Sequence, residues 1–285
     1  MTSDVYPVGI STAAVMTLPP TIVTDGHPHD RAATDDLVSL AVQWPATDTA
    51  CALRATVVLP AYNEETGLQA LLPSLLELSR DRFEVLVVDD GSTDSTASLA
   101  ESMGCRVVRH AANSGKGVAV RTGLLAARGA KVIIMDADDT YPVDAVPEII
   151  DRLDDCEMVV GVRTLGRTNI PLFNRFGNAV LTSAIRFASG SRWTDPLTGF
   201  YGIRRSALEQ MNLESNGFSL EAEIAMKSSR LGLRVLDHPI VYRARAGASK
   251  LHPVRDGLRI AAMIFALAVR RLASGPVQPA EPFFP

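Results

Sequence analysis

In the segment KVIIMDADDTYP, residues 131–142, four apolar residues after Lys131 lead directly into three aspartates within four positions. The run is continuously apolar rather than alternating, which is typical of a strand covered on both faces, as in a parallel sheet. Asp136 and Asp138 are two residues apart at its end, so an extended chain points them to the same side. The segment therefore predicts a buried parallel strand that carries two carboxylates at its carboxyl end.

Further segments of β-branched, apolar character are expected to be strands, at 55–62, 83–90, 105–110 and 157–163. Helical patterns lie between successive strands, at 65–79, 94–103, 115–128 and 142–153, and the last is expected to open at Pro142. Later segments predict helices at 170–189, 218–231 and 255–272 and strands at 199–205 and 233–245. This alternation predicts the α/β class: an open, mostly parallel, Rossmann-like sheet with helices on both faces, which binds ligands at the carboxyl ends of its strands.

The composition narrows the range of functions. A net charge of −4 and a pI of about 5.8 argue against a nucleic-acid partner. Three scattered cysteines suit isolated thiols in a reducing compartment, and neither a secretory signal nor an apolar run of about 18 residues is found. A cytoplasmic protein is therefore expected. Residues 1–50 carry six aspartates against one arginine and predict a disordered or loosely docked tail.

Two carboxylates at one sheet edge repel each other unless a cation neutralises them. Mg²⁺ or Mn²⁺ prefers oxygen ligands and can hold phosphate oxygens at the same time. We therefore expect Asp136 and Asp138 to bind such an ion, whereas Asp139 is expected to be a cap or a solvated turn residue.

Three other segments add polar groups at the same predicted edge, namely PAYNEE (60–65), VVDDGSTDST (87–96) and NSGKGVAVRTG (113–123). They supply an aromatic face for stacking, further acids, and Lys116 in a glycine-rich turn, which together suit a metal-bridged nucleoside diphosphate. The chain has no G-x-x-x-x-G-K-[ST] motif, and no G-x-G-x-x-G follows its first strand. The P-loop and dinucleotide-binding interpretations are therefore disfavoured.

In this order, VVLPAYNEE, VVDDGSTDST, NSGKGVAVRTG and the D-x-D of MDADDTYP resemble the motifs of family 2 glycosyltransferases, which have the GT-A fold. The motifs DPLTGFYGIRR (195–205), GFSLEAEIAMKSSRLGLRV (217–235) and YRARAGASKL (242–251) are similar to the polyprenyl-phosphate branch that includes dolichyl-phosphate mannose synthase. The resemblance covers about residues 54–260. It implies a catalytic domain at 51–245, followed by a basic and apolar C-terminal segment at 246–285.

The resemblance also implies roles for individual positions. On the donor side these are Pro60, Tyr62, Glu64 and Asp90 for the nucleoside, and Asp136 and Asp138 for the metal and diphosphate. On the acceptor side, Arg163 and Arg175 match basic positions near the acceptor phosphate. Independently of the resemblance, the charges of Lys116, Arg245 and Lys250 suit binding of the diphosphate. Asp195 matches an acid near the reacting centre and joins Asp138 as a catalytic candidate. Thr140 stands where this branch commonly has a metal-binding glutamine, so that ligand is not expected here.

The implied reaction is a metal-dependent, inverting transfer of a hexose from a GDP-mannose or UDP-glucose type donor to polyprenyl phosphate. A phosphate monoester has a second pKa of about 6, so this acceptor needs no general base at neutral pH. A hydroxyl acceptor does need one, and Asp195, Glu221 and Glu223 are the candidates. Glu221 and Glu223 diverge by about 200° on a helix, so one of them is expected to be structural.

The C-terminal region bears on the acceptor. Residues 243–272 carry seven lysines and arginines against one acid, and within them IAAMIFALAV (260–269) spans only about 15 Å as a helix. Such a helix is too short to cross a bilayer, but it suits peripheral contact with the inner face of the cell membrane through 255–272. A core helix or a homodimer interface explains the same pattern.

Three alternatives stay open at this stage. The same fold can transfer sugar to a small soluble hydroxyl acceptor in secondary metabolism. The second alternative is a non-catalytic nucleotide-sugar binder. The intact pair of Asp136 and Asp138 argues against it. A nucleotidyltransferase shares the architecture, but PAYNEE replaces the glycine-rich basic loop expected after its first strand.

Overall fold

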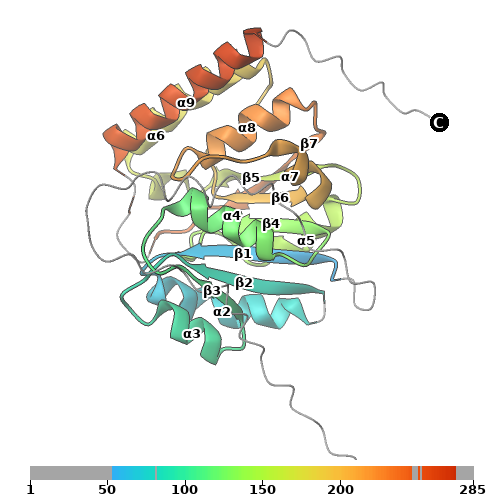
Figure 1. Cartoon of the computed structure of the whole chain (residues 1–285), viewed down its shortest axis with the longest axis vertical. Coiled ribbons are helices and arrows are strands. Elements are labelled where there is room, and N and C mark those ends of the chain that lie inside the picture. Colours follow the sequence, from blue (N-terminus) through green and yellow to red (C-terminus); the bar gives the residue numbers. More distant parts are fainter. Residues whose placement is uncertain (1–52, 81, 246–249, 251, 274–285) are drawn as a thin grey trace, which may run out of the picture. The chain divides into compact units, whose positions relative to one another are not determined.

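The computed structural model describes residues 53–80, 82–245, 250 and 252–273 of the chain. Within these ranges seven strands form one sheet, in the order β3-β2-β1-β4-β6-β5-β7 (Figure 1). The strands are β1 (Ala55–Ala61), β2 (Phe83–Asp89), β3 (Arg106–Arg109), β4 (Lys131–Met135), β5 (Met158–Leu165), β6 (Phe200–Arg204) and β7 (Val235–Val241). The helices are α2 (Glu65–Ser79), α3 (Thr96–Ser102), α4 (Lys116–Ala126), α5 (Ala145–Arg152), the 3-10 helix η1 (Arg167–Asn169), α6 (Leu172–Ser189), α7 (Arg205–Met211), α8 (Leu220–Arg230) and α9 (Pro253–Ala273).

The strands of this sheet run parallel except β6, which lies antiparallel between β4 and β5. The register pairs Phe200, the first residue of β6, with Met135, the last residue of β4. Because β6 runs in the opposite direction, the loop that precedes it reaches the edge where the parallel strands end. The predicted open, mostly parallel α/β sheet is confirmed, with one antiparallel strand inside it.

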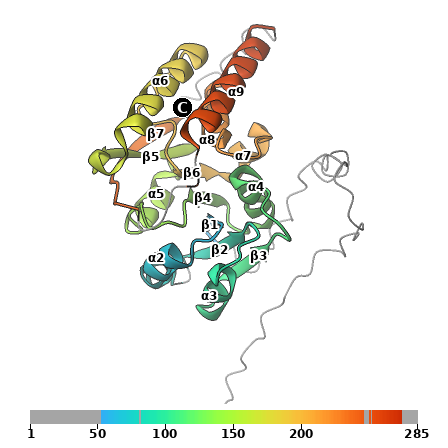
Figure 2. The same cartoon turned by 90° about the vertical axis from the view of Figure 1, so that its left-hand side faces the viewer.

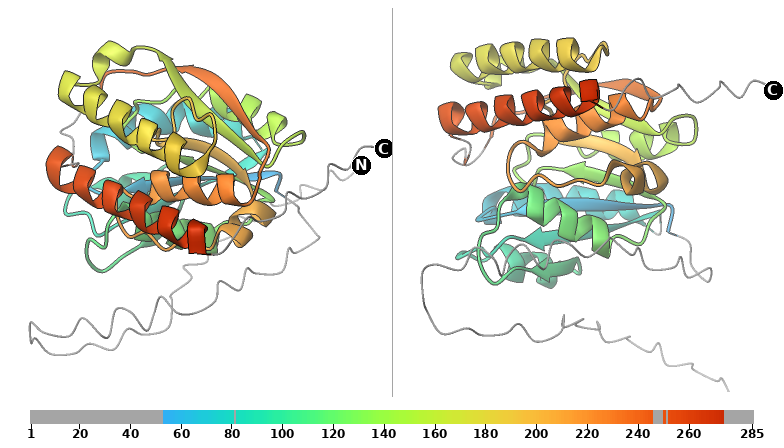
Figure 3. Two further views of the ribbon diagram at one scale, coloured as in Figure 1. Left: turned by 90° about the horizontal axis from the view of Figure 1, so that it is seen from above. Right: turned by 45° about the horizontal axis from the view of Figure 1, so that its top comes forward.

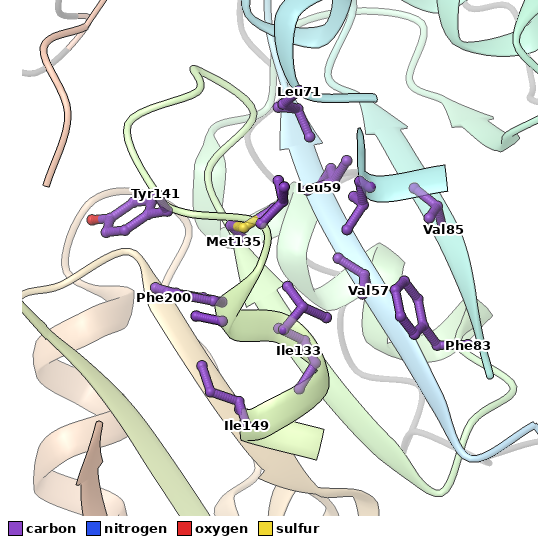
Figure 4. Close-up of a cluster of buried hydrophobic side chains, with 14 of the residues drawn as sticks. Val57, Leu59, Leu71, Phe83, Val85, Ile133, Met135, Tyr141, Ile149 and Phe200 are labelled. Atoms are coloured by element: carbon purple, nitrogen blue, oxygen red, sulfur yellow. The ribbon is translucent and has the colours of Figure 1, made fainter. Parts of the chain in front are cut away.

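Helices cover both faces of the sheet (Figure 2). On one face α2, α3 and α5 pack on a cluster that includes Ile133 and continues to Phe200 near the ligand-binding edge (Figure 4). On the other face α4, α7 and α8 enclose a second cluster, to which α6 and α9 contribute Ile185, Ile260 and Ile264. Each fully buried aliphatic or aromatic side chain of this kind stabilises the fold by about 1.5–3 kcal/mol.

Helices α6 and α9 lie side by side as an outer layer that also contacts α8 (Figure 3). The buried side of α9 carries Ile260 and Ile264, so the described part of the C-terminal segment packs onto the core.

The expected elements and the observed ones differ in a few places. Helix α5 begins at Ala145 rather than at Pro142, because residues 142–145 first form a turn in which the Ala145 amide donates to the Pro142 carbonyl at 3.3 Å. Helix α7, which directly follows β6, was not expected. Cys105 and Cys156 are buried free thiols, as predicted. The predicted tail at 1–50 and Cys51 lie outside the described residues.

Candidate active site

The strand order brings the predicted motifs together at one edge. Strand β1 lies between β2 and β4, and its last residue, Ala61, pairs in register with Asp89 at the end of β2. The segments that leave these strands therefore start from neighbouring points. They carry Tyr62 to Glu64 after β1, Asp90 after β2 and Asp136 after β4.

Asp136 is the first residue after β4, and one of its carboxylate oxygens lies 2.6 Å from Lys116 Nζ. Burial raises the pKa of Asp136 to about 6, Lys116 opposes this shift, and the charges of Asp138 and Glu221 add to it. The backbone of Gly199, which directly precedes β6, packs against the other oxygen. A Cβ atom at position 199 would overlap that oxygen, so a larger residue there would force the Asp136 carboxylate to shift.

Lys116 is the first residue of α4, and its ammonium group bridges two carboxylates. Its Nζ lies 2.6 Å from Asp136 Oδ1 and 2.5 Å from Glu221 Oε1. Burial lowers the pKa of Lys116, but the two neighbouring acids outweigh this effect and leave it above its ordinary value. The second oxygen of Glu221, Oε2, is buried and has no hydrogen-bond partner among the described residues. Such an acceptor in a low-dielectric site favours a cation or a donor group beside it.

Asp138 is almost fully buried, and both of its oxygens are engaged. Oδ1 accepts from the backbone amide of Thr140 at 3.2 Å and from the Thr140 hydroxyl at 2.6 Å. Oδ2 lies 2.9 Å from a guanidinium nitrogen of Arg245. Thr140, which was discounted as a ligand, therefore orients the carboxylate instead. Its substitution for glutamine was visible in the sequence, but this contact was not.

Glu64 shares Arg245 with Asp138 and also contacts Lys250. Its Oε1 accepts from Arg245 Nη2 and from Lys250 Nζ, each at 2.5 Å. Lys250 also donates to the Asn63 carbonyl at 3.0 Å and lies 5.8 Å from the centre of the Tyr62 ring. Arg245 and Lys250, which were predicted to bind the diphosphate, therefore lie beside the acids Glu64 and Asp138 at the sheet edge. Pro60 lies one residue earlier than the last residue of β1 and is partly exposed.

Asp90 shapes the turn that carries Lys116. Its Oδ1 accepts from the Ser114 amide at 2.9 Å and faces His110 Nδ1 at 2.7 Å, while Oδ2 accepts from the Gly115 amide at 2.7 Å. Gly115 has a φ of +99°, a conformation that favours glycine. The role expected for Asp90 was nucleoside binding; its observed contacts fix the start of α4. The His110 contact was not expected from the sequence.

Asp195 and Arg163 form a buried ion pair on the β5 and β6 side of the cluster. Arg163 Nε donates to Asp195 Oδ2 at 2.7 Å, and Arg163 Nη2 donates to Oδ1 at 2.6 Å. The guanidinium carbon of Arg163 lies 5.5 Å from the centre of the Tyr242 ring. Arg175 is exposed on α6, and no ion pair joins it to the other site residues within the described ranges.

Helix α8 turns Glu221 and Glu223 in different directions, which shows which of the two faces the site. Glu221 faces Lys116, whereas Glu223 accepts from the backbone amides of Glu214 and Ser215, each at 2.8 Å. Glu223 also pairs with Lys227 at 2.7 Å. Glu223 therefore holds the loop before α8, and Glu221 is the site-facing residue of the two.

The residues around Asp136 and Asp138 fit a divalent cation that takes its remaining ligands from phosphate. No group of three or more His, Cys, Asp or Glu side chains forms a metal cage in the described part of the chain. Magnesium sites of phosphate-transfer enzymes commonly use one or two carboxylates together with substrate phosphates. The buried Glu221 oxygen without a hydrogen-bond partner among the described residues leaves an acceptor beside Lys116 and Asp136 for such an ion or a donor group.

Known proteins resemble this chain over much of its length. The sequence profile of "Glycosyl transferase family 2" matches residues 56–211. A dolichyl-phosphate hexose transferase of Haloferax volcanii is 35% identical over 206 residues, which cover 72% of this chain and 89% of that protein. A dolichol-phosphate mannosyltransferase of Pyrococcus furiosus is 28% identical over 211 residues, covering 70% of this chain and 59% of that protein.

Solved structures share the fold. The glucosyl-3-phosphoglycerate synthase of Mycobacterium tuberculosis, solved with Mn²⁺, UDP and glucosyl-3-phosphoglycerate, superimposes with a TM-score of 0.60 at 25% identity. The match covers 77% of this chain and 80% of that one.

Proposed function

We propose, from the premise that this chain belongs to glycosyl transferase family 2, that it moves a hexose from a nucleoside-diphosphate sugar to polyprenyl phosphate. The chain is a glycosyltransferase with the GT-A fold, and its relatives support the polyprenyl-phosphate branch. The observation that carries the proposal is the pairing of Asp136 and Asp138 with Lys116 and Arg245 at the carboxyl edge of the sheet.

The donor is proposed to lie across this edge, with its diphosphate near Asp136 and Asp138. A Mg²⁺ or Mn²⁺ ion held there would neutralise the charge that develops on the leaving diphosphate. Lys116 keeps Asp136 ionised and adds positive charge from the side of α4. Tyr62 is proposed to stack on the base, and Lys250, 5.8 Å from the centre of the Tyr62 ring, is proposed to bind the phosphates.

Polyprenyl phosphate needs no deprotonation, and the arrangement of acids suits such an acceptor. Both oxygens of Asp195 are engaged by Arg163, and both oxygens of Glu223 hold backbone amides. Asp195 is therefore proposed to fix Arg163 and not to act as a base. Glu221 retains a free acceptor oxygen, Oε2, within the described residues, so it is the candidate base if the acceptor is a hydroxyl.

An exposed apolar surface on α6 and α9 is proposed to rest on the membrane that contains the acceptor. Among the described helices none is long and apolar enough to cross a bilayer. The two helices nevertheless turn large apolar side chains outward, namely Leu172, Phe173, Phe176, Val180 and Phe187 from α6 and Val254, Leu258, Phe265 and Val269 from α9. These helices also carry exposed arginines, including Arg175, Arg255 and Arg259. An apolar helix face with basic neighbours binds anionic lipid surfaces.

Peripheral attachment at the inner face of the cytoplasmic membrane follows from this proposal. A homodimer that buries the same two faces is the competing use of the surface. The Mycobacterium tuberculosis enzyme is named for its product, glucosyl-3-phosphoglycerate, which is a small molecule. Transfer of a sugar to a small soluble hydroxyl acceptor is therefore the second candidate function.

The test is a transfer assay with purified protein, radiolabelled UDP-glucose or GDP-mannose, a polyprenyl phosphate, and either Mn²⁺ or EDTA. We expect metal-dependent label that partitions into organic solvent. Label found only in a water-soluble glycoside would select the second candidate. Transfer that persists undiminished in EDTA and in Asp138→Asn would contradict the proposed site.

A further inference from the structure

Arg245 joins the two acids that the donor half of the site presents. Its Nη2 lies 2.5 Å from Glu64 Oε1 and its Nη1 lies 2.9 Å from Asp138 Oδ2. The third guanidinium nitrogen, Nε, is buried and has no hydrogen-bond partner among the described residues. A buried donor without a partner is unfavourable, so this guanidinium has capacity for a further anionic ligand.

Both carboxylate oxygens of Asp138 already have partners, so a cation that binds Asp138 has to approach an occupied oxygen. Its Oδ1 is already held by the amide and the hydroxyl of Thr140. The remaining oxygen, Oδ2, is the one that Arg245 contacts. A divalent ion that binds this oxygen therefore meets the positive charge of Arg245 beside it.

Displacing Arg245 would leave neither acid without a positive neighbour. Lys250 contacts the same oxygen of Glu64 at 2.5 Å, so Glu64 remains paired when Arg245 moves away. Asp138 would receive the metal ion in exchange. The guanidinium, with its free Nε, would then lie beside the position proposed for the diphosphate, whose oxygens suit a planar fork of donors.

We infer that Arg245 is an internal counter-cation that competes with the metal for Asp138 and exchanges this carboxylate for the diphosphate when the donor binds. The inference rests on the proposed function and adds a property to it. Without nucleotide, Arg245 weakens metal binding; with nucleotide, it has another anionic partner and the competition is relieved. Metal and nucleotide therefore bind with positive coupling, and part of that coupling passes through Arg245.

The test measures Mn²⁺ binding by electron paramagnetic resonance of the free ion, without nucleotide and with UDP or GDP. We expect Arg245→Gln to lower the Kd for Mn²⁺ in the absence of nucleotide by on the order of tenfold, equivalent to about 1.4 kcal/mol. The nucleotide should then strengthen Mn²⁺ binding less in the variant than in the unmodified protein. Arg245→Lys, which keeps the charge but cannot span both acids, should give an intermediate Kd.

Arg243→Gln is the matched control. Arg243 lies two residues away in the chain and contacts Asp139 at 3.3 Å, so its loss removes the same charge without freeing Asp138. An unchanged or weaker Mn²⁺ affinity in Arg245→Gln would overturn the inference, as would an equal gain in Arg243→Gln. If the unmodified protein binds no Mn²⁺ even with nucleotide, the proposed metal-dependent function fails together with the inference.

Discussion

Arg163 and Asp195 are 32 residues apart in the sequence and share two hydrogen bonds, of 2.6 and 2.7 Å, inside the protein. Their side chains are only 8% and 6% exposed. The Arg163 backbone amide also donates to Asp195 at 3.1 Å, so the carboxylate fixes the end of β5 as well as the guanidinium. Burial disfavours the charged form of Arg163, but Asp195 outweighs this effect and raises its pKa.

We therefore expect Asp195→Asn to act mainly on stability. Removing one charge of a buried pair leaves the other uncompensated, which typically costs about 3–5 kcal/mol. Urea denaturation of the variant should show a loss of this size. A variant with unchanged stability and a large drop in kcat would instead identify Asp195 as a group that acts directly in the reaction.

The two glutamates of α8 should separate stability from activity. Glu223→Gln removes charge from a side chain that holds two backbone amides and Lys227, so we expect a loss of about 1–3 kcal/mol of stability. Glu221→Gln acts on the partner of Lys116, so we expect a lower rate of transfer with a smaller change in stability. Thermal denaturation and initial rates on the same preparations measure both effects. Reversed effects would contradict the assignment of the two faces.

Asp138→Asn should raise the Mn²⁺ concentration required for transfer by tenfold or more, because the substitution removes a charged metal ligand. A tenfold change corresponds to about 1.4 kcal/mol of binding free energy. Asp139→Asn is the control, because Asp139 has a φ of +58°, which asparagine tolerates, and it lies outside the proposed metal pair. Metal titrations of the initial rate compare the two variants. Equal shifts in both would assign the effect to general loss of negative charge.

The surface of α6 and α9 is tested with Phe176→Ser and Phe265→Ser, two side chains that are each 71% exposed. Since neither is buried, the melting temperature should change little. Each substitution should weaken co-sedimentation with vesicles that contain anionic lipid by on the order of tenfold, given about 1.5–3 kcal/mol for a buried phenylalanine. Leu125→Ser, on α4 and 42% exposed, is the control. If the phenylalanine variants bind vesicles normally but no longer sediment as dimers, the surface is an interface between copies.

Much of the proposed donor site was predictable, because parallel strands end at a common edge, which brings the acids at their ends close together. Asp136 and Lys116 come together for this reason, although they belong to different βα units. The distant partners were not predictable in the same way. Arg245 and Glu64 are 181 residues apart, and their contact depends on how the chain returns after β7.

The face on which Glu221 and Glu223 lie could not be decided by periodicity. The helical repeat shows that the two residues diverge, but only the packing of α8 against the loop at Glu214 and Ser215 shows which one faces inward. Helix α7 was missed because seven residues are too few for a periodic pattern to stand out. Thr140 was noticed as an unusual residue, but its hydroxyl contact requires the turn conformation.

The reversed direction of β6 divides this edge into two parts of different origin. The parallel strands β1, β2 and β4 reach this edge with their carboxyl ends, whereas β6 starts there. Gly199, the residue before β6, lies against Asp136. The loop between α6 and β6 thus contacts Asp136 through Gly199 and Arg163 through Asp195, so a change in its length would disturb both contacts together.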